Sequence, residues 1–152
     1  MTLRQDINDA MKTAMKEKDQ VRLSTLRLVN AAIKDRDIAA RSEDRCDGVT
    51  DEEILAVLTK MVKQRDESFK TYEEAGRLDL AEREQTESEI IKSFLPRQLS
   101  EDEIQQAVAG VVDELEADGL KDMGRCMGAL KQRYAGSMDF GRAGALMKER
   151  LG

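Results

Sequence analysis

The most informative absence in this 152-residue sequence is histidine, of which there is none; tryptophan is missing as well. Without histidine the chain cannot build a Ser-His-Asp triad, an HExxH metalloprotease or a histidine-ligated di-iron bundle. Its two cysteines would need carboxylate help to close a zinc site, and no serine, threonine or cysteine stands in a recognisable nucleophile pattern. The sequence therefore predicts no catalytic residue, no metal site and no cofactor.

Proline and aromatic residues are also scarce. There is one proline, and aromatic residues make up 3% of the chain, which argues against an all-β domain. No apolar run approaches the roughly 18 residues that a membrane span needs, so no membrane is expected as a partner. The first residues are amphipathic and carry acids, unlike a signal or transit peptide. Together with two thiols, Cys126 expected in the core and Cys46 in a polar loop, this predicts a cytoplasmic protein.

Residues that strongly favour helices are abundant, and the hydrophobic periodicity predicts an all-α protein. The expected helices cover about residues 3–16, 19–40, 50–75, 79–94, 100–118, 122–134 and 140–151. Capping-box pairs mark the starts of several of them: Thr2 with Gln5, Thr50 with Glu53, Asp79 with Glu82, and Ser100 with Glu103. In the helix over 79–94 only the last apolar residues are expected to be buried, namely Ile90, Ile91, Phe94 and Leu95.

The single proline indicates where the chain divides. Pro96 disfavours the helical conformation at Leu95, and a new helix starts soon afterwards, so Leu95 and Pro96 form the predicted hinge. We expect an N-terminal four-helix unit, residues 1–95, followed by a small three-helix domain, residues 96–152. In that domain Gly124 and Gly128 are four residues apart on one helix face, a spacing that allows close helix packing.

Charge is distributed unevenly along the chain, although its total is −6. Residues 96–120 contain seven acids and one base, whereas residues 121–152 contain seven bases and three acids. The seven bases are the candidate RNA-binding residues: Lys121, Arg125, Lys131, Arg133, Arg142, Lys148 and Arg150. A segregated basic surface is one interpretation; the other is that helix C-termini collect cations. The acidic total argues against duplex DNA as a partner.

Four segments together resemble the YqeY family. They are residues 26–34 (LRLVNAAIK), residues 63–65 with 72–77 and 79–81 (KQR, YEEAGR, DLA), residues 95–100 (LPRQLS) and residues 122–130 (DMGRCMGAL). The match extends over essentially the whole chain. One departure concerns the turn before the last helix, where the family has a Gly-Arg-Ala-Asp-Gly-Lys type of sequence and this chain reads GSMDFGR, so that the base arrives only at Arg142.

The resemblance implies a function. The family is related to the C-terminal part of the B subunit of glutamyl/aspartyl-tRNA amidotransferase, where a three-helix tail helps to hold tRNA. It therefore implies a non-catalytic RNA-binding accessory module that contacts tRNA through the basic C-terminal tail.

Two alternatives stay open. One is a helical protein-protein interaction module, with the helices over 79–94 and 100–118 as the docking face for a protein partner. The other is a component associated with carbon-nitrogen ligase activity with glutamine as amido-N-donor, although the larger region that performs that chemistry in the amidotransferase is absent here.

Overall fold

The computed structural model describes residues 2–42 and 48–152. All of its regular elements within these residues are helices, which confirms the predicted all-α class. The α-helices are α1 (Leu3–Lys16), α2 (Gln20–Arg41), α3 (Asp51–Glu74), α4 (Leu78–Lys92), α5 (Glu101–Glu114), α6 (Met123–Tyr134) and α7 (Phe140–Leu151), and a short 3₁₀ helix, η1 (Leu120–Asp122), precedes α6. Tertiary contacts divide the chain into residues 1–95 and residues 96–152, and each unit has its own core.

Local capping signals position most helix starts. The Thr50 hydroxyl accepts a hydrogen bond from the Glu53 backbone amide at 3.2 Å, and the Glu53 carboxylate accepts one from the Thr50 amide at 3.3 Å. The same reciprocal pairs occur at Thr2 and at Ser100, as their sequences predict. Each box satisfies backbone donors that the first turn of a helix cannot pair internally.

The predicted capping box at Asp79 is wrong. Helix α4 already begins at Leu78, with Arg77 at the cap position and no side-chain cap. The reason lies in the preceding turn, where Gly76 has a φ of +74° and the Arg77 amide donates to the Tyr72 carbonyl at 2.8 Å. This Schellman-type ending of α3 leads the chain directly into α4, so Asp79 lies inside the helix, where it cannot cap.

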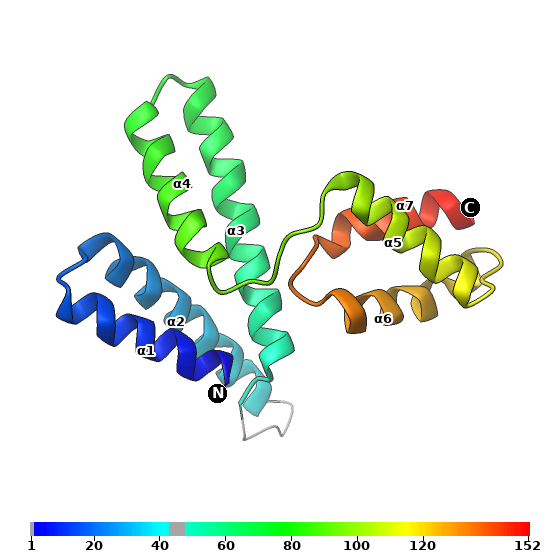
Figure 1. The fold of residues 1–152 in the computed structure, drawn as a ribbon, viewed down its shortest axis with the longest axis horizontal. Coiled ribbons are helices and arrows are strands. Elements are labelled where there is room, and N and C mark those ends of the chain that lie inside the picture. The colour runs from blue at the N-terminus through cyan, green and yellow to red at the C-terminus, as the bar shows by residue number, and fades with distance from the viewer. Residues whose placement is uncertain (1, 43–47) are drawn as a thin grey trace. The chain divides into compact units, whose positions relative to one another are not determined.

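The N-terminal unit consists of two helical hairpins, α1–α2 and α3–α4 (Figure 1). Its core gathers residues from all four helices: Ile7, Leu26, Val29, Ile33, Ala40, Val49, Ile54, Leu58, Met61 and Ile91. The buried residues of α3 all lie in its first half, ending at Met61. Beyond that point α3 pairs with α4 in a hairpin end that projects away from α1 and α2 (Figure 1).

A polar layer joins α3 to α4, and it corrects the expected burial of α4. Besides Ile91, the residues Ala81, Glu87 and Ser88 are buried. The Glu87 carboxylate lies 3.4 Å from Arg65 Nε, and the Ser88 hydroxyl donates to the Asp66 carboxylate at 2.9 Å. Glu87 is buried because its partner, Arg65, occupies a core-facing position of α3.

The C-terminal unit packs α5, α6 and α7 around one small core. Its buried residues are Ile104, Ala107, Val108, Val111, Val112, Cys126, Leu130, Met138, Ala143 and Met147. The segment that follows Pro96 is fastened to the turn between α6 and α7, since the Leu99 amide donates to the Ser137 carbonyl at 2.8 Å. Leu95 instead packs against the N-terminal core. That residues 95 and 96 act as a hinge stays a prediction.

Candidate nucleic-acid interface

The polar side chains of the described residues do not converge on a catalytic group. No cluster of three metal-ligating side chains occurs in residues 2–42 and 48–152. Cys126 is a free, buried thiol, as expected, whereas Cys46 lies outside the described residues. Of the helices described, none has both the length and the apolar character needed to cross a bilayer. The C-terminal unit presents a set of exposed cations.

All seven candidate RNA-binding residues are exposed. Lys121 lies in η1, three bases lie on α6 and three on α7: Arg125, Lys131, Arg133, Arg142, Lys148 and Arg150. The structure does not gather them on one face, because the spacing of the bases along each helix places their side chains on different sides of it. Their hydrogen bonds and ion pairs divide them into two classes.

Two of the arginines are bound to the acidic helix α5. Arg133 makes a bidentate pair with Glu114, with Nη1 and Nη2 donating to the two carboxylate oxygens at 2.6 and 2.8 Å. Arg142 donates through Nε and Nη2 to Glu101, with the Nε bond at 2.9 Å. These hydrogen bonds lower the pKa values of both carboxyls and raise the pKa values of both guanidinium groups. Both arginines are therefore engaged by carboxylates of their own unit, in pairs that stay partly exposed to solvent.

Arg125 is held by a different set of acceptors. Its Nη2 donates to the Leu115 carbonyl at 3.0 Å and lies 3.4 Å from the Asp122 carboxylate. The pKa of Asp122 is lowered first by the hydrogen bond from the Asp118 amide and also by Arg125. This arrangement fixes the guanidinium at the end of α5 and leaves some of its five donors available.

Lys121, Lys131, Lys148 and Arg150 form no ion pair with any described residue. Arg150 borders a shallow hollow of about 290 Å³ between α5 and α7, together with Gln105 and Leu146. These four exposed cations are the ones free to meet an anionic ligand. Sequence reasoning missed this division because it treated the acids of α5 and the bases that follow as separate surfaces, although both belong to one small bundle.

The two glycines of α6 do not pack as expected. Gly124 and Gly128 are both exposed, and a Cβ atom added at either position would meet nothing within 4 Å. The prediction that they allow close helix packing within this chain is therefore wrong. Helix α6 buries the opposite side, through Cys126 and Leu130, so its glycine side faces solvent.

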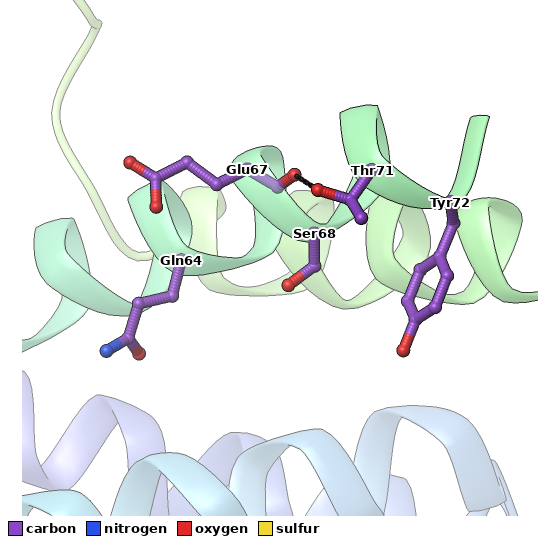
Figure 2. Close-up of a pocket in the computed structure, with 5 residues that line it drawn as sticks. All are labelled: Gln64, Glu67, Ser68, Thr71 and Tyr72. Carbon is purple, nitrogen blue, oxygen red and sulfur yellow. Dashed lines mark hydrogen bonds between the residues drawn. The ribbon is translucent and has the colours of Figure 1, made fainter. Parts of the chain in front are cut away.

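A separate shallow groove of about 430 Å³ lies on α3 in the N-terminal unit. Figure 2 shows Gln64, Ser68 and Tyr72 pointing to the same side, towards the ribbons of the α1–α2 hairpin. Glu67 also borders it, and its backbone carbonyl accepts a hydrogen bond from the Thr71 hydroxyl at 3.1 Å. The groove offers one carboxylate, Glu67, among uncharged hydrogen-bonding groups from successive turns of one helix, and no assembled acid-base pair.

The fold and surface define an all-helical protein of two units, with exposed cations on its C-terminal unit. Its membership follows from a family model, Yqey-like protein, that matches residues 4–151: the chain belongs to the YqeY family.

Three relatives share the name altered inheritance of mitochondria protein 41, mitochondrial. That of Clavispora lusitaniae is 34% identical over 110 residues, which cover 71% of this chain and 61% of the relative. That of Lachancea thermotolerans is 37% identical over 109 residues, 70% of this chain and 56% of the relative. That of Pyrenophora tritici-repentis is 26% identical over 129 residues, which cover 83% of this chain and 67% of the relative. The chain thus spans about three fifths of the length of the first two.

These names correct the predicted cytoplasmic location, which is contradicted by relatives named as mitochondrial proteins. The prediction was drawn from the residues near the N-terminus. The similarity covers only part of each relative, and the relatives contain residues beyond it.

Proposed function

We propose that this protein is a non-catalytic RNA-binding module whose C-terminal unit, residues 96–152, holds a tRNA-like RNA. The observation that carries the proposal is the set of exposed cations without an ion-pair partner in the described residues: Lys121, Lys131, Lys148 and Arg150. Unpaired lysines and arginines bind phosphates without first breaking an internal ion pair. The resemblance of this unit to the tRNA-holding tail of the amidotransferase B subunit supports the same choice of ligand.

The mode of binding follows from what the unit can offer. Its two aromatic side chains, Tyr134 and Phe140, are half-buried and pack against the C-terminal core, so they are poorly placed to stack on bases. Contacts would therefore go to phosphates and 2′-hydroxyl groups, and recognition would depend on the shape of the RNA more than on its sequence. The binding is expected to weaken steeply with salt.

The experiment measures the binding of fluorescently labelled total tRNA to the full-length protein by fluorescence anisotropy in low salt. Reversing two unpaired charges, Lys131→Glu with Lys148→Glu, should weaken binding about tenfold or more, because each lost phosphate contact lowers the affinity. The matched control reverses Lys60 and Lys70 on α3, which changes the net charge equally but lies in the other unit. Absence of binding by the wild type, or an equal loss in the control, would overturn the proposal.

The protein-docking alternative rests on α4 and α5. On α5, however, the acids Glu101, Glu103 and Glu114 already pair with arginines of the same unit, which withdraws them from a partner. A salt-insensitive protein complex containing no RNA would favour this alternative.

The ligase association is tested separately. Release of ammonia from glutamine by the purified protein, in the presence of tRNA and ATP, would show that the module is catalytic.

A further inference from the structure

One exposed side of α6 carries two glycines, and a Cβ atom added at either would meet nothing within 4 Å. Gly124, Gly128 and Lys131 follow one another at intervals of four and three residues, so they share one side of the helix. Lys121 precedes this row by three residues in η1. All four residues are exposed. We call them the basic face of α6; a lysine stands at each end of it, and the two positions in between carry no side chain.

The charges of α6 itself are of one sign, although the acid Asp122 stands next to Lys121 in η1. Helix α6 contains three bases and no aspartate or glutamate. Of the bases, Arg133 is occupied by Glu114, whereas Lys131 forms no ion pair with any described residue. Arg125, next to Gly124 in the chain, has its guanidinium positioned by the Leu115 carbonyl. A polyanion is the partner whose charge complements such a face.

The glycines add a steric argument to the electrostatic one. Glycine destabilises the interior of a helix relative to alanine, and at both positions there is room for a methyl group. Packing within the unit therefore gives no reason for glycine here. Absence of side chains does allow the backbone of a ligand to come close to the helix axis, where the lysines at both ends can reach its charges.

We propose that the sugar-phosphate backbone of a bound RNA lies along the basic face of α6, with Lys121 and Lys131 on phosphates and the bare backbone at Gly124 and Gly128 in direct contact with the RNA. This inference rests on the proposed function and adds the place and the manner of contact. A protein helix could also pack on glycines, next to the exposed Leu120 of η1, but it would have to neutralise both lysines.

The test is to add a methyl group and measure stability and binding together in the full-length protein. Gly128→Ala should raise the Tm by about 2–4 °C, because alanine favours the helix interior and meets no neighbour, whereas Gly124→Ala, at the second residue of α6, should raise it less. Each should nevertheless weaken the binding of total tRNA by about threefold, and the pair by about tenfold, a change of roughly 1.4 kcal/mol. A purely structural role of the glycines predicts no such loss.

Helix α5 supplies the matched control. Gly110 is also an exposed glycine inside a helix, and a Cβ there would again meet nothing within 4 Å. Gly110→Ala should raise the Tm by a similar amount and leave tRNA binding unchanged. Replacing Lys121 and Lys131 by alanine should reduce the slope of log affinity against log salt by about two, whereas Lys60→Ala in α3 should leave it unchanged.

The outcomes separate this inference from the proposed function. If wild-type protein binds tRNA and the three glycine variants all bind like it, the basic face of α6 is not the contact surface, although the proposed function stands. If the wild type does not bind tRNA, both fall. If Gly124→Ala abolishes a salt-insensitive protein complex and leaves tRNA binding intact, the occupant is a protein and the RNA assignment is wrong.

Discussion

The buried pair between Arg65 and Glu87 offers the sharpest test of how the N-terminal unit is held together. Replacing Glu87 by methionine keeps the length of the side chain and its helix propensity, but it removes the carboxylate. Only 14% of the Arg65 side chain and 10% of the Glu87 side chain are exposed, so water cannot replace the lost partner fully. Arg65 Nε, which lies 3.4 Å from Glu87 and makes no hydrogen bond, would then carry a buried charge with nothing opposite it.

The size of the effect follows from this geometry. At 3.4 Å and an effective dielectric constant of about 20, the gross attraction is about 5 kcal/mol, and desolvation of both groups offsets a large part of it. Removing one partner of such a pair typically costs 3–5 kcal/mol. We expect the lower end, about 3 kcal/mol, because the Arg65 side chain reaches solvent in part and still donates to the Met61 carbonyl at 3.2 Å. The Tm should fall by roughly 6–12 °C.

The assay is urea unfolding of the full chain followed by far-ultraviolet circular dichroism. Arg65→Met with Glu87→Met should recover most of the stability lost in Glu87→Met, since two apolar side chains of similar size replace the pair. Arg65→Met alone should cost less, because it leaves Glu87 with Arg83, whose Nε lies 3.7 Å from the carboxylate. Glu82→Met, at an exposed position of α4, is the control and should change the free energy of unfolding by less than about 0.5 kcal/mol. A loss below about 1 kcal/mol for Glu87→Met, or additive losses in the double variant, would refute the reasoning.

Three further predictions concern charges and backbone conformation. Glu114→Gln should free Arg133 and strengthen tRNA binding about two- to threefold in filter binding, with a steeper salt dependence. The control Asp113→Asn frees no arginine and should give a smaller gain. Equal gains would contradict the idea that Glu114 competes with RNA for Arg133. The pKa of Glu103 is lowered to about 2, first by Arg97, so the contribution of this carboxylate to stability is present above about pH 4.5 and is lost as the pH falls towards 2. Glu103→Gln should therefore make the Tm, measured by calorimetry, less dependent on pH across that window. An unchanged pH profile would contradict this role of Glu103. Gly76→Ala, at a φ of +74°, should lower the free energy of unfolding by about 1 kcal/mol in the same urea assay, and a gain in stability would show that the turn tolerates a side chain.

Helix starts were predictable where the cap is local. Thr50 and Ser100 each cap a helix with a glutamate three residues later, and both pairs occur as predicted. All the information for such a cap lies within four residues, so the tertiary structure need not be known. Asp79 had the same pattern and failed, because the turn at Gly76 had already started the next helix at Leu78.

Burial of charged residues was harder to predict. Glu87 lies in a run of polar residues, and nothing beside it in the chain distinguishes it from an exposed glutamate. The sequence contains one indication elsewhere: Arg65 occupies a position in the apolar stripe of α3, and a buried base requires an acid as its partner. Which acid forms the ion pair depends on how α3 and α4 align. For the candidate interface, exposure of the seven bases follows from residue type, whereas their pairing does not.

By itself, the sequence determined that this protein is helical, where most of its helices begin and that histidine chemistry is excluded, because these properties depend on composition and on contacts a few residues apart. Only the tertiary structure decided that Glu114 and Glu101 pair with Arg133 and Arg142 and that Gly124 faces solvent. Such pairings join residues 19 and 41 positions apart. They depend on the packing of whole helices, because an ion pair forms only where the fold brings two side chains within a few ångströms.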